Sequence, residues 1–267
     1  MSQEPSAPSI CVIVPVYGQL AYARRTLASL FAKSPWATAV VVDDASPDWN
    51  TDWLKGFDPA KIKVYRYPKN GGLTRSWNAG FQLAKAFNPQ YIVAGNADIL
   101  FTAGWWRALL AAMAQGYDLV GPISNAPGVT APRKSQHVST YVSDYRVTDD
   151  PAYLDQVAAR AYSTYVTSAR VVEAPINGFF MMAETATWRK YSYSPELIFP
   201  PLITRMPSGR KNRTPLMTGQ EDFLCARIRA AGGRTAIVPG SFIWHYRSVS
   251  RGTKFVKGDW FRAKETG

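Results

Sequence analysis

Polar residues follow three apolar runs that are predicted to be buried strands. They are Tyr17, the pair Asp43-Asp44, and Asn96 with Asp98 in the run Asn-Ala-Asp. In an open α/β sheet, ligands bind at the carboxyl ends of the strands. One acid at a strand end is explained equally well as a helix cap, whereas several polar side chains at one edge indicate a binding site. We therefore expect a polar ligand at this edge.

Two common nucleotide-binding motifs are absent from the sequence. The turn after the first strand reads Tyr17-Gly18-Gln19-Leu20, without the Gly-rich phosphate cradle of a dinucleotide-binding fold. The Walker pattern is missing as well, and Gly71 and Gly72 follow the third strand, where neither motif would lie. A dehydrogenase is therefore not indicated.

The first half of the chain alternates strand and helix patterns. Strands are expected at residues 10–16, 39–42, 62–65, 91–94 and 119–121, and helices at 20–31, 73–87 and 105–115. Such alternation predicts an α/β fold, with a mostly parallel sheet covered by helices on both faces.

The second half is less regular. Helices are expected at residues 151–168 and 223–231, and short strands at 178–183, 236–238 and 242–244. Residues 195–219 are rich in Pro, Gly, Arg and Lys and are expected to form a long loop. Loops of this length are usually functional or disordered.

The chain is strongly basic. Its 267 residues carry a formal net charge of +12. This excess indicates an anionic partner such as phosphate groups or a membrane surface, although many proteins are basic without such a partner. Nucleic acid is not expected, because the acids at the strand ends would repel its phosphates.

The sequence shows no targeting or membrane-spanning segment. No window of about 18 apolar residues is present, and residues 1–9 form a polar leader that does not resemble a secretory signal. Cys11 and Cys225 are too few for a disulfide framework and are expected in the core. A cytoplasmic location, with peripheral contact at a membrane surface, is the expectation.

Several motifs, in this order, resemble those of the family 2 glycosyltransferases. They are Val-Ile-Val-Pro-Val-Tyr at 12–17, Val-Asp-Asp-Ala-Ser at 42–46, Asn70-x-Gly72, Asn78-x-Gly80, Asn96-Ala97-Asp98, Gly178-Phe179-Phe180, Glu221-Asp222 and His245 with Ser250. The resemblance covers residues 10 to about 251. It implies a GT-A fold, a Rossmann-like mixed sheet, and transfer of a sugar from a nucleotide-sugar with inversion at the anomeric carbon.

The resemblance also implies how the donor is held. Pro15, Tyr17 and Asp44 would contact its base and ribose, with Asp44 accepting the ring N–H of uracil or thymine. UDP- or dTDP-sugars are therefore the expected donors, and GDP-sugars stay open because guanine also offers N–H groups. The remaining donor-binding residues by this resemblance are Asn70, Gly72, Asn78, Asn96 and Asp98.

A divalent metal is implied by the same resemblance. Asp98 would bind the metal and His245 would complete its site. The metal, Mg²⁺ or Mn²⁺, would neutralise the leaving diphosphate, and a histidine ligand favours Mn²⁺. Asn96 stands where the family usually has an aspartate, so it contributes no charge. The other histidine, His137, is expected at the surface.

The Glu221-Asp222 pair would supply the catalytic base. The pair lies one residue closer to Arg227 than usual in the family, so two alignments are open. Aligned by the pair itself, Asp222 is the base, which is the preferred interpretation. Aligned without a gap, Glu221 takes that position. Both acids could also simply cap the helix that follows.

An extra basic segment separates the Gly178 strand from the acidic pair. It spans residues 200–218 and contains no helical apolar pattern, so it is expected to be mobile. We expect it to close over the donor diphosphate or to grip an anionic acceptor, such as a lipid-linked diphosphate. Its cations are Arg205, Arg210, Lys211 and Arg213.

These features predict the following organisation and function. Residues 1–9 are a leader, 10–121 the nucleotide-sugar half, 122–251 the acceptor and catalytic half, and 252–267 a tail. The expected activity is metal-dependent transfer of a hexosyl or deoxyhexosyl group to a hydroxyl of a glycan or lipid-linked acceptor in polysaccharide biosynthesis. The alternatives are a nucleotidyltransferase and an inactive GT-A fold that binds a glycan or a partner protein.

Overall fold

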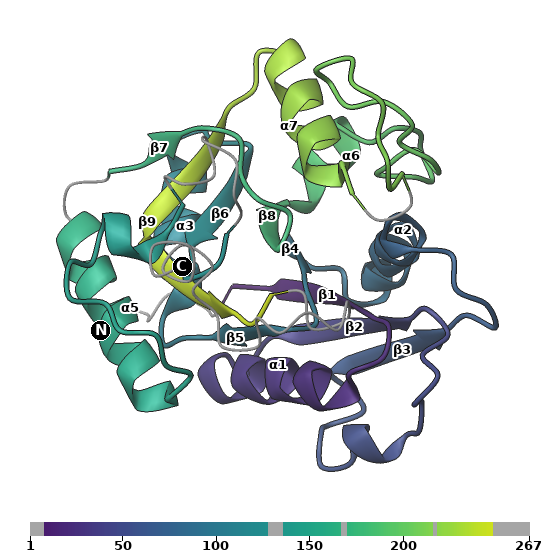
Figure 1. The fold of residues 1–267 in the computed structure, drawn as a ribbon, viewed down its shortest axis with the longest axis horizontal. Helices are drawn as coiled ribbons and strands as arrows, with labels where there is room; N and C mark the ends of the chain where they lie inside the picture. Colours follow the sequence, from purple (N-terminus) through teal and green to yellow (C-terminus); the bar gives the residue numbers. More distant parts are fainter. Residues whose placement is uncertain (1–7, 128–135, 167–169, 216–217, 248–267) are drawn as a thin grey trace, which may run out of the picture.

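A single nine-stranded sheet runs through both halves of the chain (Figure 1). The computed structural model describes residues 8–127, 136–166, 170–215 and 218–247. The strand order is β3-β2-β1-β4-β8-β6-β9-β5, and β7 pairs with β9 beside this path. The predicted leader and tail lie almost entirely outside the described residues.

The strands are β1 (Ile10–Val16), β2 (Thr38–Asp43), β3 (Ile62–Arg66), β4 (Tyr91–Gly95), β5 (Ile99–Phe101), β6 (Leu119–Ile123), β7 (Val172–Glu173), β8 (Phe180–Glu184) and β9 (Thr235–His245). The helices are α1 (Leu20–Lys33), α2 (Leu73–Ala84), α3 (Trp105–Ala114), α5 (Pro151–Tyr165), α6 (Thr185–Lys190) and α7 (Gln220–Ala230). Short 3₁₀ turns are η1 (Asp52–Leu54), η2 (Lys85–Phe87) and η3 (Val138–Thr140).

The predicted mixed α/β class is confirmed. Strands β1 to β4 pair in parallel, as the βα alternation requires. Antiparallel pairs enter where β8 joins β4 and where β5 joins β9. The second half therefore completes the sheet begun by the first.

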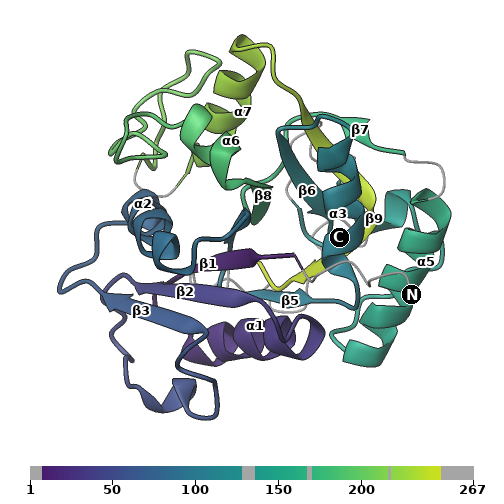
Figure 2. The ribbon, with the colours of Figure 1, turned by 180° about the vertical axis from the view of Figure 1, so that it is seen from behind.

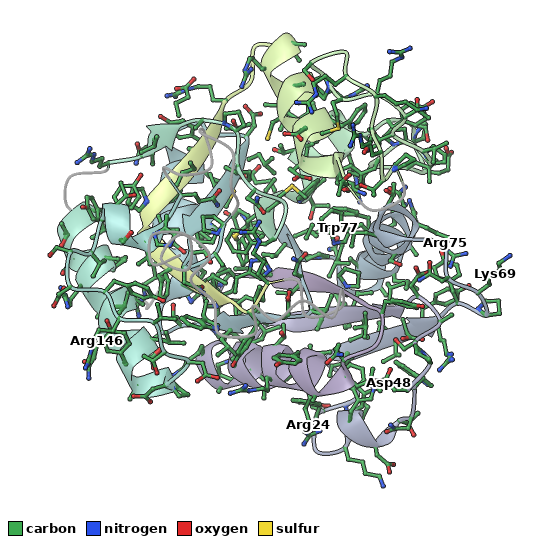
Figure 3. All side chains as sticks on the ribbon, in the orientation of Figure 1. Arg24, Asp48, Lys69, Arg75, Trp77 and Arg146 are labelled. Carbon is green, nitrogen blue, oxygen red and sulfur yellow. The ribbon has the colours of Figure 1, made fainter. Side chains whose placement is uncertain are left out.

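Alternate residues of β1 contact opposite layers of helices. Cys11 and Ile13 belong to the core that includes Trp77 of α2, whereas Val12 and Val14 belong to the core beneath α1 and α3. The two layers are visible on either side of β1–β3 in Figure 2. The Trp77 side chain of α2 is buried in the interior of the molecule, whereas Lys69 projects from the molecular surface (Figure 3).

The largest difference from the sequence prediction concerns β9. We expected two short strands, at 236–238 and 242–244, because Pro239 and Gly240 interrupt the apolar run. The structure has one continuous strand from Thr235 to His245, and a shift in its register with β6 absorbs the interruption. Strand β5 and helix α6 were not predicted, because each is too short to show a periodic pattern.

Both cysteines are buried and free, as expected. Burial raises the pKa of the Cys11 thiol to about 12. Among the residues that the structure describes, no helix has the length and apolar character needed to cross a bilayer.

Candidate active site

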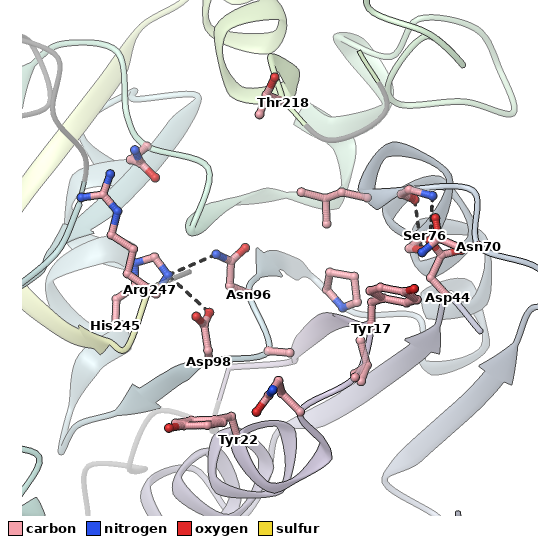
Figure 4. Close-up of a pocket in the computed structure, with 18 of the residues that line it drawn as sticks. Tyr17, Tyr22, Asp44, Asn70, Ser76, Asn96, Asp98, Thr218, His245 and Arg247 are labelled. Carbon is pink, nitrogen blue, oxygen red and sulfur yellow. Dashed lines mark hydrogen bonds and ion pairs between the residues drawn. The ribbon is translucent and has the colours of Figure 1, made fainter. Parts of the chain in front are cut away.

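A cavity of about 340 Å³ opens at the carboxyl ends of β1, β2 and β4 (Figure 4). Polar side chains gather at two ends of it, with Asp98 and His245 at one end and Tyr17 and Asp44 at the other. Of the donor-binding residues predicted from sequence, the cavity wall contains Pro15, Tyr17, Asp44, Asn70, Gly72, Asn96 and Asp98. The sheet edge thus gathers most of the predicted donor site.

The pairing of β5 with β9 brings Asp98 and His245 together. Ile99 lies opposite His245 in this antiparallel pair, and the Tyr246 backbone N–H donates to the Asp98 carbonyl at 2.9 Å. His245 Nε2 then lies 3.3 Å from Asp98 Oδ1 and 3.2 Å from Asn96 Nδ2. Two residues from opposite halves of the chain therefore share one small polar cluster.

The orientation of the His245 ring is fixed on every side. Its Nδ1 lies 3.0 Å from the Ala126 carbonyl, which can only accept a hydrogen bond, so Nδ1 is the donor. Asn125 clamps the backbone of His245, accepting from its N–H at 2.7 Å and donating to its carbonyl at 3.0 Å. The ring of Phe179 stacks on the imidazole at 5.0 Å.

This orientation fits a divalent cation between His245 and Asp98. In the neutral ring the proton is on Nδ1, so Nε2 carries a lone pair, and both Asn96 Nδ2 and Asp98 Oδ1 lie beside it. A cation bound by Nε2 and by Asp98 Oδ1 would draw on both atoms at once. One imidazole and one carboxylate suit Mn²⁺, with its remaining positions left for ligand oxygens. No group of three or more His, Cys, Asp or Glu residues suited to a metal occurs in the described ranges.

Asp44 organises the turn that precedes α2. Its carboxylate accepts from the Gly72 N–H at 2.6 Å and from the Gly71 N–H at 3.0 Å, and Arg75 Nη2 lies 2.5 Å from Oδ1. Gly72 has a φ of 89°, which favours glycine at this position. The Arg75 guanidinium also stacks on Tyr67. Sequence reasoning missed Arg75, because its link to Asp44 depends on the fold of this turn.

Asn78 has a structural position rather than one in the cavity. It is buried in α2, accepts from the Phe199 N–H at 2.9 Å and donates to the Phe199 carbonyl at 2.9 Å. Gly80, the other member of its motif, lets α2 approach β1, since a Cβ there would lie 2.2 Å from Ile13 Cγ2. The expectation that Asn78 contacts the donor is therefore corrected.

The two acids of α7 face different surroundings. A Cβ at Gly178 would lie 3.0 Å from Glu221 Oε2, so Glu221 packs against the segment that contributes Asn177 to the central cavity. Asp222 lines a second cavity, together with residues of the basic loop. Neither acid is among the residues lining the central cavity, but Glu221 contacts the segment that reaches it.

The basic loop contains no helix or named strand in its described residues, and its backbone makes local contacts. Arg205 and Lys211 form an antiparallel bridge, and the Met206 N–H donates to the Arg210 carbonyl at 2.9 Å. The side chain of Asn212 is buried and donates to the carbonyls of Ile203 and Thr218, both at 2.8 Å.

His137 is buried, so its predicted surface position is wrong. Its backbone pairs with Ser124 beside β6, and its Nδ1 accepts from the Ser139 N–H at 3.2 Å. The polar sequence before His137 did not indicate this backbone pairing. His137 thus serves as the N-cap of η3.

Several residues of the cavity wall were not singled out from the sequence. They are Gln19, Tyr22, Ser76, Asn177, Thr218 and Arg247. Arg247 lies beside His245, two residues beyond it in the chain (Figure 4). Arg247 could have been found from the sequence by its position two residues after His245, because a cation next to the histidine suits an anionic ligand.

The chain belongs to a known enzyme family. Residues 11–168 match the sequence model described as Glycosyl transferase family 2. This match covers more than half of the chain, and it confirms the resemblance drawn from the motifs. A comparison with curated protein sequences gives no match.

Solved structures with a similar fold are GT-A glycosyltransferases. GalNAc-T7 with UDP, GalNAc and Mn²⁺ has a TM-score of 0.56 at 16% identity, covering 91% of this chain and 44% of that one. TarS 1-349 of S. aureus has a TM-score of 0.51 at 16% identity, covering 89% and 60%. The mannosyltransferase PcManGT of Pyrobaculum calidifontis, in complex with GDP-Man and Mn²⁺, has 0.50 at 16%, covering 91% and 60%. The chain thus spans about half of the length of these proteins, and the likeness concerns the fold.

Proposed function

We propose that this glycosyltransferase moves a sugar from a nucleoside diphosphate donor to an acceptor hydroxyl, with inversion, in the 340 Å³ cavity. The observation that carries the proposal is the junction of Asp98 with His245, opposite Tyr17 and Asp44 in the same cavity. The first pair suits a metal-bound diphosphate, and the second pair suits a nucleoside. Similar folds bound to UDP or GDP-Man with Mn²⁺ support this assignment.

The metal would be held by Asp98 and His245. When bound, Mn²⁺ or Mg²⁺ supplies positive charge that stabilises the departing diphosphate. Asn96 lines the same cavity, with Nδ2 3.2 Å from His245 Nε2, and would contact the ribose or the diphosphate. Arg247, from the same end of the cavity, adds a further positive charge.

The base end of the cavity favours a pyrimidine with a ring N–H. Asp44 lines the cavity and offers carboxylate oxygens to that N–H. Tyr17 is 46% exposed and able to stack on the ring. UDP- or dTDP-sugars are therefore the donors that we propose. Gly71, Gly72 and Arg75 donate to Asp44, and a carboxylate with about four acceptor positions can still accept from the base.

The catalytic base that we propose is Glu221, which reverses the preference drawn from the sequence. A base must lie within hydrogen-bond reach of the attacking hydroxyl. Glu221 packs against Gly178 beside the central cavity, whereas Asp222 lines the other one. Inversion follows from attack opposite the leaving group, with Glu221 removing the hydroxyl proton. A glycan or a lipid-linked glycan is the proposed acceptor.

A thermal-shift and hydrolysis screen tests the assignment. Nucleoside diphosphates and their sugars are added with Mn²⁺ or with a chelator, and the melting temperature and release of free sugar are measured. A ligand that binds the native state raises the melting temperature. The proposal expects stabilisation and sugar release that both require Mn²⁺. Absence of both with every donor would support the inactive glycan-binding alternative instead.

A further inference from the structure

A second cavity, of about 510 Å³, lies between α7 and the basic loop. Four cations line it, with Arg210, Lys211 and Arg213 from the loop and Arg229 from α7. Asp222 is the one acid among its lining residues. The loop lies beside α7 at one end of the molecule in Figures 1 and 2.

Four cations and one acid leave the wall of this cavity with an excess of positive charge. In the described part of the chain, none of the four cations forms an ion pair or a side-chain hydrogen bond, whereas Arg160 pairs with Asp144 elsewhere on the surface. Like charges around one cavity repel each other, and an anion bound among them removes this repulsion.

The loop presents its cations from an ordered backbone. Asn212 ties the loop to Ile203 and Thr218, and Gly209 makes its tip with a φ of 80°. A pre-ordered loop loses little entropy when a ligand binds, so its charges act together rather than as separate flexible side chains.

The second cavity adjoins the central one. Pro175 lines the second cavity and Asn177 the first, while Asn212 of the second bonds to Thr218 of the first. Asp222 of α7 lines the second cavity, and its neighbour Glu221 packs against Gly178, next to Asn177 of the first. The second cavity is therefore on the side of the proposed base, away from Tyr17 and Asp44.

We propose that this cavity binds a phosphate or diphosphate group carried by the acceptor. Arginine forks and a lysine ammonium are the groups that bind phosphate oxygens best in proteins. The phosphate would anchor the acceptor behind α7 while its hydroxyl reaches Glu221. The acceptor role rests on the proposed transfer reaction, whereas anion binding itself does not.

Calorimetry with inorganic pyrophosphate, in chelator and without nucleotide, tests the binding. The full chain is compared with the triple loop variant Arg210→Ala/Lys211→Ala/Arg213→Ala. The control is Lys55→Ala/Lys63→Ala/Lys85→Ala, which removes the same charge from exposed positions on other elements. The site predicts at least a tenfold loss of affinity in the first variant and less than a twofold change in the control. Equal losses in both, or no binding by the full chain, would overturn the proposal.

Single substitutions on α7 sharpen the test. Arg229→Ala should weaken pyrophosphate binding about threefold or more, while Arg227→Ala, on the same helix but outside the cavity wall, should not. Asp222→Asn removes the one acid and should strengthen binding. Weaker binding after Asp222→Asn would contradict the assignment, because a neutral residue cannot repel the anion.

Vesicles identify the source of the phosphate. Sedimentation with phosphatidylcholine vesicles, with and without phosphatidic acid, is compared for the full chain and the triple loop variant. Loop-dependent binding to phosphatidic acid indicates a lipid-borne phosphate, and loop-dependent binding to pyrophosphate alone indicates a soluble acceptor; either supports the site. Sugar release without any pyrophosphate or vesicle binding would overturn the cavity assignment alone. Loop-dependent binding without transfer to any acceptor would overturn the proposed function alone.

Discussion

His245 Nε2 lies 3.3 Å from Asp98 Oδ1, and the pairing of β9 with β5 holds the two residues together. Because Nδ1 of the same ring donates to the Ala126 carbonyl, Nε2 carries the lone pair, between Asn96 Nδ2 and Asp98 Oδ1. Strand pairing thus places the two residues that we propose as metal ligands within contact of each other. Substitution of either residue therefore tests the proposed metal site directly.

Asp98→Ala should abolish transfer and leave the fold intact, because the diphosphate charge loses its anchor. His245→Ala should weaken Mn²⁺ binding and reduce transfer less severely. Chelator should inhibit the unmodified enzyme, and Mn²⁺ should restore its activity. Turnover with each candidate donor, alongside circular dichroism, checks both points. Full activity of Asp98→Ala in chelator would refute the metal role.

Asn125→Ala should weaken Mn²⁺ binding by roughly tenfold, because residues that orient a ligand typically matter at this scale. Asn125 makes two hydrogen bonds to the backbone of His245. Calorimetry with Mn²⁺ measures the change.

Asn78→Ala is the matched control for this experiment. Asn78 is also a buried asparagine with two backbone hydrogen bonds, but both go to Phe199, away from the metal site. Both variants should lose stability, by about 1–3 kcal/mol in urea unfolding, since buried backbone groups lose their partners. Equal Mn²⁺ affinity in the two variants would show that Asn125 does not position His245.

The fold was predictable because its signals are local. The apolar run of β1 and the helical spacing of α1 lie within single short segments, and both elements occur where they were expected. Prediction of the site also required the order of the motifs along the whole chain. Asp98 and His245 meet only through β5, a three-residue strand whose pattern is too short to detect.

Contacts between distant segments explain what sequence reasoning missed. Asn78 was predicted to bind the donor because Asn78-x-Gly80 resembles a family motif, yet its partner is Phe199. The sequence likewise did not show which of the two acids, Glu221 or Asp222, packs against Gly178. That depends on which side of α7 faces Gly178. No local pattern reports the rotation of a helix whose apolar face is weak.

Glu221→Gln should lower turnover by about 10²–10⁴-fold with donor affinity nearly unchanged, as expected for a general base. Asp222→Asn should lower turnover less, because Asp222 faces the second cavity. Single-turnover kinetics with saturating donor separate the chemical step from binding. The reverse order of the two effects would restore Asp222 as the base.

UDP and dTDP should bind more tightly than CMP in the presence of Mn²⁺, since cytosine lacks the ring N–H that Asp44 accepts. Calorimetry with UDP, dTDP, GDP and CMP decides this point, and GDP serves to test the guanine alternative. A clear preference for CMP would contradict the assignment of Asp44.

Tyr17→Ala should weaken UDP binding by about 1–3 kcal/mol, the usual contribution of an aromatic ring stacked on a base. Tyr17→Phe keeps the ring and is the matched control, so its affinity should stay close to that of the unmodified chain. If both variants bind UDP equally well, Tyr17 does not stack on the base.

Asn212→Ala should loosen the basic loop and expose it to trypsin. Asn212 donates to the carbonyls of Ile203 and Thr218 and accepts from the Thr214 N–H at 3.1 Å. Its loss leaves these groups without partners, which costs about 1–3 kcal/mol in the buried part of the loop. Because Arg210, Lys211 and Arg213 are trypsin sites within that loop, cleavage there should accelerate well before global unfolding.

Asn50→Ala is the control, since Asn50 is exposed and bonds only to its own turn. Mass spectrometry of the early fragments checks the site of cleavage, and an unchanged rate after Lys211 in Asn212→Ala would show that the order of the loop does not depend on Asn212.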